Sequence, residues 1–111
     1  MKKVRVLTEG EREVTRRGQR VVTTTRDSLA LMFGEPTTTN PDHRGNDQSI
    51  WEVGFTGKSG EEEFFSVYNF WKNDNVLGRN DKNNYVWNVG AEESSNVSEF
   101  VLFLNKNLKR Y

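Results

Sequence analysis

Few residues of this chain have the types and spacing that chemistry requires. His43 is the only histidine, and it lies next to Asp42 and four positions before Asp47. A histidine near carboxylates can form an acid–base pair or part of a metal-ligand set, because imidazole titrates near neutral pH. The neighbouring residues are polar and rich in turn formers, which is typical of a solvated surface loop. The sequence therefore assigns no catalytic residue and no metal ligand.

Two short stretches resemble fragments of ligand-binding motifs. Residues 57–60 (GKSG) share letters with a phosphate loop but lack the upstream glycine and the strand-to-helix context. Residues 73–84 (NDNVLGRNDKNN) carry Asp74 and Asp81, but they do not match the alternate carboxylates, central glycine and final glutamate of an EF-hand loop. We expect no cofactor, and we expect that the protein is not an enzyme.

The composition predicts one folded domain with one hydrophobic core. The chain has 111 residues, and 12% of them are aromatic, which is unlike a disordered chain. Sixteen basic residues balance sixteen acidic ones, so no global field attracts nucleic acid. Cysteine is absent, and no apolar run is long enough for a signal peptide or a membrane span. These features favour a protein in the cytoplasm of the host cell without a membrane partner.

The first 19 residues are locally basic and are expected to form an arm or edge strands, followed by one α+β domain at residues 20–111. Arg16, Arg17 and Arg20 could contact nucleic-acid phosphates, which attract lysine and arginine side chains. Glutamates are interleaved with these arginines, which is more typical of a solvated edge or tail. Nucleic-acid binding through this arm therefore remains an alternative.

A strand and a short helix are expected next. The stretch RVVTTT is β-branched and favours a strand. Thr24 and Asp27 have the spacing of a capping box at a helix start. The helix should end near Phe33, because Gly34 can adopt a left-handed cap and a proline follows soon after. Residues 37–49 (TTTNPDHRGNDQS) are expected to be a loop.

The centre of the chain contains all three tryptophans and predicts a meander of strands at residues 50–55, 64–71 and 85–89. Trp51, Val53 and Phe55 should share one face of the first strand. The second strand has aromatic residues on both faces. Such a strand is either covered twice or leaves one aromatic set exposed to a partner.

An amphipathic helix should complete the chain. Asn96 is the expected cap, and Glu99 lies at the capping-box position. The apolar stripe of the helix is formed by Val97, Phe100, Val101, Leu104 and Leu108. The predicted fold is α+β: an antiparallel three- to four-stranded meander packed by the C-terminal helix and by one short helix in the N-terminal half.

The order of these segments resembles small proteins encoded by phages and large DNA viruses. In that group a helix end of the type LFGEP precedes strands of the types W-x-V/I-x-F, IYD-x-K and W-x-I-G-G. Here residues 20–108 contain MFGEP, IWEVGF, FSVYNFW and YVWNVGA in the same order. Asn69 replaces the aspartate of that pattern, and Ala91 replaces its second glycine. The resemblance implies a viral accessory protein and carries no assigned chemistry.

Three functions therefore stay open. The preferred one is a non-enzymatic phage accessory protein that binds and inhibits a host protein, with an anti-defence role of the anti-CRISPR type. The alternatives are a nucleic-acid-binding protein and a protein that sequesters a small ligand such as a nucleotide signal. Tryptophan and tyrosine dominate binding hot spots, although core packing would explain the same residues. The expected partner contacts are Tyr68, Asn69, Trp71, Lys72 and Trp87. A homodimer that covers exposed aromatic residues is also left open.

Overall fold

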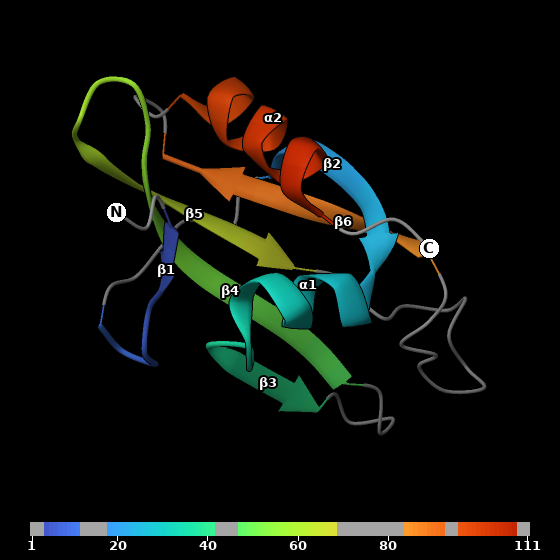
Figure 1. The fold of residues 1–111 in the computed structure, drawn as a ribbon. Coiled ribbons are helices and arrows are strands. Elements are labelled where there is room, and N and C mark those ends of the chain that lie inside the picture. Colours follow the sequence, from blue (N-terminus) through green and yellow to red (C-terminus); the bar gives the residue numbers. More distant parts are fainter. Residues whose placement is uncertain (1–3, 12–17, 42–46, 69–83, 93–95, 109–111) are drawn as a thin grey trace.

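The computed structural model describes residues 4–11, 18–41, 47–68, 84–92 and 96–108 (Figure 1). The strands within these ranges are β1 (Val4–Val6), β2 (Gly18–Thr25), β3 (Thr38–Pro41), β4 (Asp47–Thr56), β5 (Glu62–Tyr68) and β6 (Asn84–Ala91). The helices are α1 (Arg26–Phe33) and α2 (Val97–Asn107). The fold is α+β, as the sequence predicts.

All strands form one antiparallel sheet in the order β1-β4-β5-β6-β2, and β3 pairs with β4 beside β1. The meander of β4, β5 and β6 is confirmed, with Trp51 opposite Val67 and Val67 opposite Val89. Within the described residues the sheet has six strands, more than the three to four predicted. The end of the second predicted strand, residues 69–71, lies outside the described residues.

The prediction of a loop at residues 37–49 is wrong. Thr38–Pro41 forms β3 and pairs with the first residues of β4, from Asp47 to Ile50. Threonine has a high strand propensity, and a proline is tolerated at the end of an edge strand because no ladder hydrogen bond is required there. The Asn, Pro, Asp and Gly residues of this stretch gave it the composition of a loop.

Glu52 marks the position on β4 where the pairing with β3 ends and the pairing with β1 begins. Its backbone N–H donates to Thr37 Oγ1 over 2.9 Å, and its carbonyl oxygen accepts from the backbone N–H of Leu7 over 2.8 Å. Backbone groups in a buried strand need such partners, because an unpaired one costs free energy. The Thr37 side chain thus takes the place of a backbone hydrogen bond to β4, at the point between the pairing with β3 and the pairing with β1.

Helix α1 begins one residue later than the capping box predicts. The cap is Thr25, whose Oγ1 accepts from the backbone N–H of Ser28 over 3.0 Å. The helix ends at Phe33, as predicted, and the N–H of Gly34 donates to the carbonyl oxygen of Ala30 over 2.7 Å. Gly34 has φ 80° and ψ −146°, which lies outside the expected left-handed helical region but in a region that only glycine readily adopts.

Both helices pack on the same face of the sheet, as predicted (Figure 1). The ring of Phe100 in α2 stacks on Phe65 in β5 with centroids 4.3 Å apart, and Leu104 is fully buried. This core consists mainly of Leu29, Phe33, Trp51, Val53, Phe55, Phe65, Val67, Trp87, Val89, Phe100 and Leu104. Neither helix within the described ranges has the length and apolar character needed to cross a bilayer.

The opposite face of the sheet is not uniformly exposed. Ile50, Ser66 and Tyr68 are buried there, and Glu52 is only 6% exposed. The simple alternation of buried and solvated positions expected for β4 therefore fails at Glu52. On β2 and β6 the same face is open, since Val21 and Val86 are each 55% exposed.

Candidate functional site

The structure buries two of the predicted partner contacts. Trp87 is 0% exposed and Tyr68 only 3% exposed, so neither of these two side chains is accessible to a partner, whereas Trp71 lies outside the described residues. Trp87 lies edge-on to Trp51 with centroids 5.7 Å apart, and its Nε1–H donates to the carbonyl oxygen of Thr24 over 3.1 Å. Trp51 and Trp87 belong to the core between the sheet and the helices, whereas Tyr68 is buried on the opposite face of the sheet.

Of the other candidate residues, one is exposed on the sheet, and the others named below lie outside the described part of the chain. Arg20 is exposed on β2, and its Nη2 donates to Ser98 Oγ of α2 over 3.3 Å. The positions outside the described residues are Arg16, Arg17, Asp42, His43, Asn69, Trp71 and Lys72. Within the described ranges, no group of three or more His, Cys, Asp or Glu side chains is placed to hold a metal ion.

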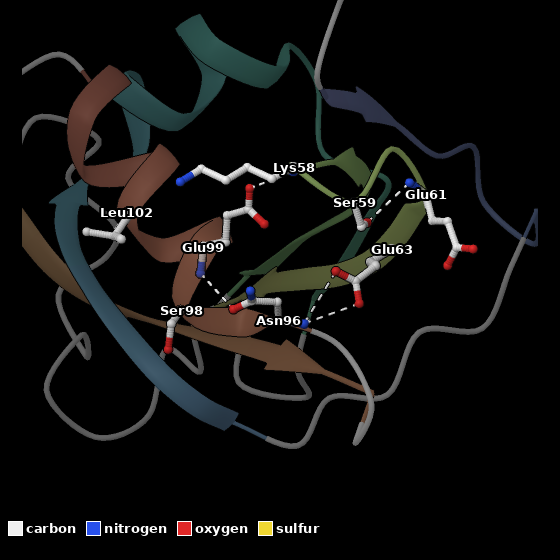
Figure 2. Close-up of a pocket in the computed structure, with 8 residues that line it drawn as sticks. All are labelled: Lys58, Ser59, Glu61, Glu63, Asn96, Ser98, Glu99 and Leu102. Atoms are coloured by element: carbon white, nitrogen blue, oxygen red, sulfur yellow. Dashed lines mark hydrogen bonds between the residues drawn. The ribbon is translucent and has the colours of Figure 1, made fainter.

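A surface groove of about 540 Å³ lies where the start of α2 meets the turn between β4 and β5 (Figure 2). One wall comes from α2 and its cap, and the other comes from the turn and the first residues of β5. The lining residues are Lys58, Ser59, Glu61, Glu63, Asn96, Ser98, Glu99 and Leu102. The groove is therefore assembled from two segments that are distant in sequence.

Two hydrogen bonds hold the two walls together, and a third caps the helix within its own wall. Glu99 accepts from the backbone N–H of Lys58 over 2.8 Å, and Glu63 accepts from the N–H of Asn96 over 3.2 Å (Figure 2). The side chain of Asn96 in turn accepts from the N–H of Glu99 over 3.1 Å, which confirms Asn96 as the helix cap. Charged acceptors make such bonds stronger than neutral ones.

The predicted capping box is therefore only half formed. In a capping box Glu99 would accept from the N–H of Asn96. Here Glu63 binds that N–H, which frees Glu99 to bind the turn at Lys58. Local spacing could not reveal this exchange, because Glu63 comes from β5 and lies 33 residues before the cap.

Gly57 lets the turn approach α2 this closely. A Cβ atom at this position would lie 2.5 Å from Glu99 Oε1, which is well inside van der Waals contact. Any other residue would have to displace the Glu99 carboxylate from its position beside Lys58. The glycine in the GKSG stretch thus serves packing against the helix.

The groove combines an exposed apolar side chain with mostly negative charge. Leu102 is 70% exposed and lies on α2 outside the apolar stripe that packs on the sheet. Three carboxylates, from Glu61, Glu63 and Glu99, accompany a single ammonium group from Lys58. Sequence analysis missed this set, although a leucine on the polar side of a helix was a signal that pointed to it.

A second charged cluster lies at the β1 edge of the sheet. Arg5 Nε contacts Glu62 Oε2 over 2.7 Å, and Arg5 Nη1 contacts Glu11 Oε2 over 2.7 Å. The hydrogen bond from Arg5, together with one from the backbone of Thr8, lowers the pKa of Glu11 below its ordinary value. The same two glutamates raise the pKa of Arg5. The cluster fixes the edge strand and presents no free charge pattern for a ligand.

Comparison with known proteins gives no relative for this chain: no family model, no curated protein and no solved structure matches it.

Proposed function

We propose that this chain is a non-enzymatic viral accessory protein that binds and inhibits a host protein in the cytoplasm, with an anti-defence role. The observation that carries the proposal is Leu102, a 70% exposed leucine beside the charged groove at the start of α2. An apolar centre with a polar rim is the usual anatomy of a protein-binding surface. The resemblance to phage-encoded proteins supplies the viral setting.

The charge of the groove supports a partner that presents a positive group. Glu61, Glu63 and Glu99 outnumber Lys58, so the local field favours a positive group. Glu63 and Glu99 each accept backbone hydrogen bonds, but an ionised carboxylate has acceptor sites for several donors. The best match is a host segment that presents an arginine or lysine beside an apolar side chain.

The two alternative functions fit this groove less well. Nucleic acids and nucleotide signals both present phosphates, which the three groove carboxylates repel. The volume of the groove falls within the range of small-ligand pockets, roughly 300–1,000 Å³, but its lining suits a cationic ligand. Nucleic-acid binding would depend instead on Arg20 and on the undescribed Arg16 and Arg17.

Affinity purification from host lysate, with and without nuclease, tests the proposal. We expect a host protein that copurifies in stoichiometric amount after nuclease treatment and is lost with Leu102→Asp. Leu31→Asp is the matched control, because Leu31 is 67% exposed on the other helix. Glu61→Lys should weaken capture by reversing a charge on the rim.

Two results would contradict this proposal. Equal capture by the Leu102 and Leu31 variants would remove the groove as the binding surface. Recovery of nucleic acid alone, with no companion protein after nuclease treatment, would favour the nucleic-acid alternative.

A further inference from the structure

We propose that two copies of this chain pair through the outer edge of β2, so that their sheets join into one continuous antiparallel sheet. β2 lies at one end of the strand order and, among the described strands, is hydrogen-bonded to β6 alone. It is eight residues long, so its outer edge offers a row of backbone donors and acceptors. The proposal concerns a surface distinct from the groove at α2.

The two edges of the sheet differ in how well they are protected from such pairing. At the other edge β1 has three residues and β3 has four, and β3 ends in Pro41. There Arg5 is held by Glu62 and Glu11, which places charges along the edge. Short strands, charges and proline are the usual devices that prevent edge-to-edge association.

Residues 21–25 of β2 lack these devices, and Arg20, which donates a hydrogen bond to Ser98 of α2, is the charged residue that precedes them. Residues 21–25 are two valines and three threonines, with no charge and no proline. Its register with β6 is regular from Arg20 to Thr25, and the irregularity lies before it, between Gly18 and Arg20. Valine and threonine favour extended pairing, so this edge is a ready template for another strand.

A second copy suits this edge because the strand is complementary to itself. A twofold axis at Val22 places Val22 opposite its own copy, Val21 opposite Thr23, and Arg20 opposite Thr24. No like charges face each other in this register, and β-branched side chains pair well across strands. The chain also has a net charge of zero, so no overall repulsion keeps two copies apart.

An axis at Val22 also pairs more of the strand than an axis at Thr23. With the axis at Val22 residues 19–25 pair with their copies, whereas an axis at Thr23 pairs only residues 21–25, because Arg20 would then face Arg26, which begins α1. In the register with the axis at Val22, the core-facing residues of one copy lie opposite the core-facing residues of the other. The helices of both copies therefore lie on the same side of the joined sheet. The exposed side chains of Val21 and Thr23 then meet on the opposite side.

Sedimentation velocity across a range of concentrations tests the dimer, using Val21→Lys and Val86→Lys as a matched pair. Both valines are 55% exposed on the same face, but Val21 is on the edge strand and Val86 on the adjacent inner strand. We expect the parent and Val86→Lys to dimerise alike, and Val21→Lys to raise the dissociation constant at least tenfold. A monomer at every concentration, or equal effects of the two variants, would overturn the proposal.

Cysteine cross-linking provides a second measurement, which is clean because the natural chain has no cysteine. Equimolar Val21→Cys and Thr23→Cys variants, mixed and oxidised, should give a covalent heterodimer, since the two positions oppose each other in the proposed register. Circular dichroism confirms that each variant remains folded. Absence of any covalent dimer in the mixture would overturn the pairing of β2 with its copy.

Discussion

The carboxylate of Glu99 accepts a hydrogen bond from the backbone N–H of Lys58 over 2.8 Å, joining the start of α2 to a turn 41 residues earlier in the chain. The same turn leads into β5, where Glu63 binds the N–H of the helix cap. The two glutamates therefore position the walls of the groove as well as contributing its charge. A change that separates Glu99 from Lys58 should affect stability and groove shape together.

Gly57→Ala should destabilise the domain by about 1 kcal/mol, the net value of one intramolecular hydrogen bond. The added methyl group displaces Glu99 and breaks its bond to Lys58. Urea unfolding of Gly57→Ala, Glu99→Gln and the double variant measures the coupling. We expect the double variant to lose less than the sum of the singles, whereas strict additivity would show that the two positions do not interact.

Leu104→Ala should destabilise the protein by about 2–5 kcal/mol, because the leucine is fully buried between α2 and the sheet. Leu102→Ala, two positions earlier on the same helix, should change stability by less than about 0.5 kcal/mol. Chemical denaturation measures both variants under the same conditions. Equal stability losses would mean that α2 does not dock through Leu104.

The contact between Arg5 and Glu11 predicts a pH dependence of stability. Hydrogen bonding lowers the folded-state pKa of Glu11 from its ordinary value of 4.5. The ionised carboxylate therefore contributes stability above its unfolded-state pKa, and this contribution is lost as the pH falls through the folded-state pKa. Glu11→Gln should be less stable than the parent at neutral pH and equally stable in strong acid. The difference should be small and sensitive to salt, since the pair is exposed.

An NMR titration of the Glu11 carboxyl group tests the cause of that shift. Arg5→Gln removes the principal hydrogen-bond donor, so the pKa of Glu11 should rise towards 4.5. A value that stays low in this variant would assign the shift to the backbone of Thr8 instead.

Replacement of Arg16, Arg17 and Arg20 by glutamine tests nucleic-acid binding by the N-terminal arm. Each lost phosphate contact should reduce the slope of log affinity against log salt by about one. Fluorescence anisotropy with a labelled duplex at several salt concentrations measures this slope. Binding that is absent, or unchanged in the triple variant, would exclude the arm as a phosphate-binding element.

The sequence predicted the elements that depend on local pattern. The 3.6-residue period of α2, the alternation of Trp51, Val53 and Phe55, and the glycine stop after Phe33 all have short-range physical causes. The meander followed from them, because consecutive strands joined by turns tend to pair with their neighbours.

The groove and the exposed surfaces could not be predicted in this way. Burial of Tyr68 and Trp87 depends on what covers each face of the sheet, and aromatic residues look the same in a core and in an interface. The partnership of Glu63 with Asn96 depends on a contact across 33 residues. Such long-range contacts leave no periodic signal along the chain.

The placement of β2 also determines the order in which the chain can fold. The bond from Trp87 to Thr24 spans 63 residues, whereas β4 and β5 are joined by a short turn. Closing the longer loop costs more chain entropy, so the β4–β5 hairpin can precede the pairing of β2 with β6. Substitutions in β2 should then mainly accelerate unfolding, while substitutions in the hairpin should slow folding. β2, which pairs with no described strand other than β6, should thus join the sheet after the β4–β5 hairpin, and until it does the chain exposes unpaired strands that favour aggregation.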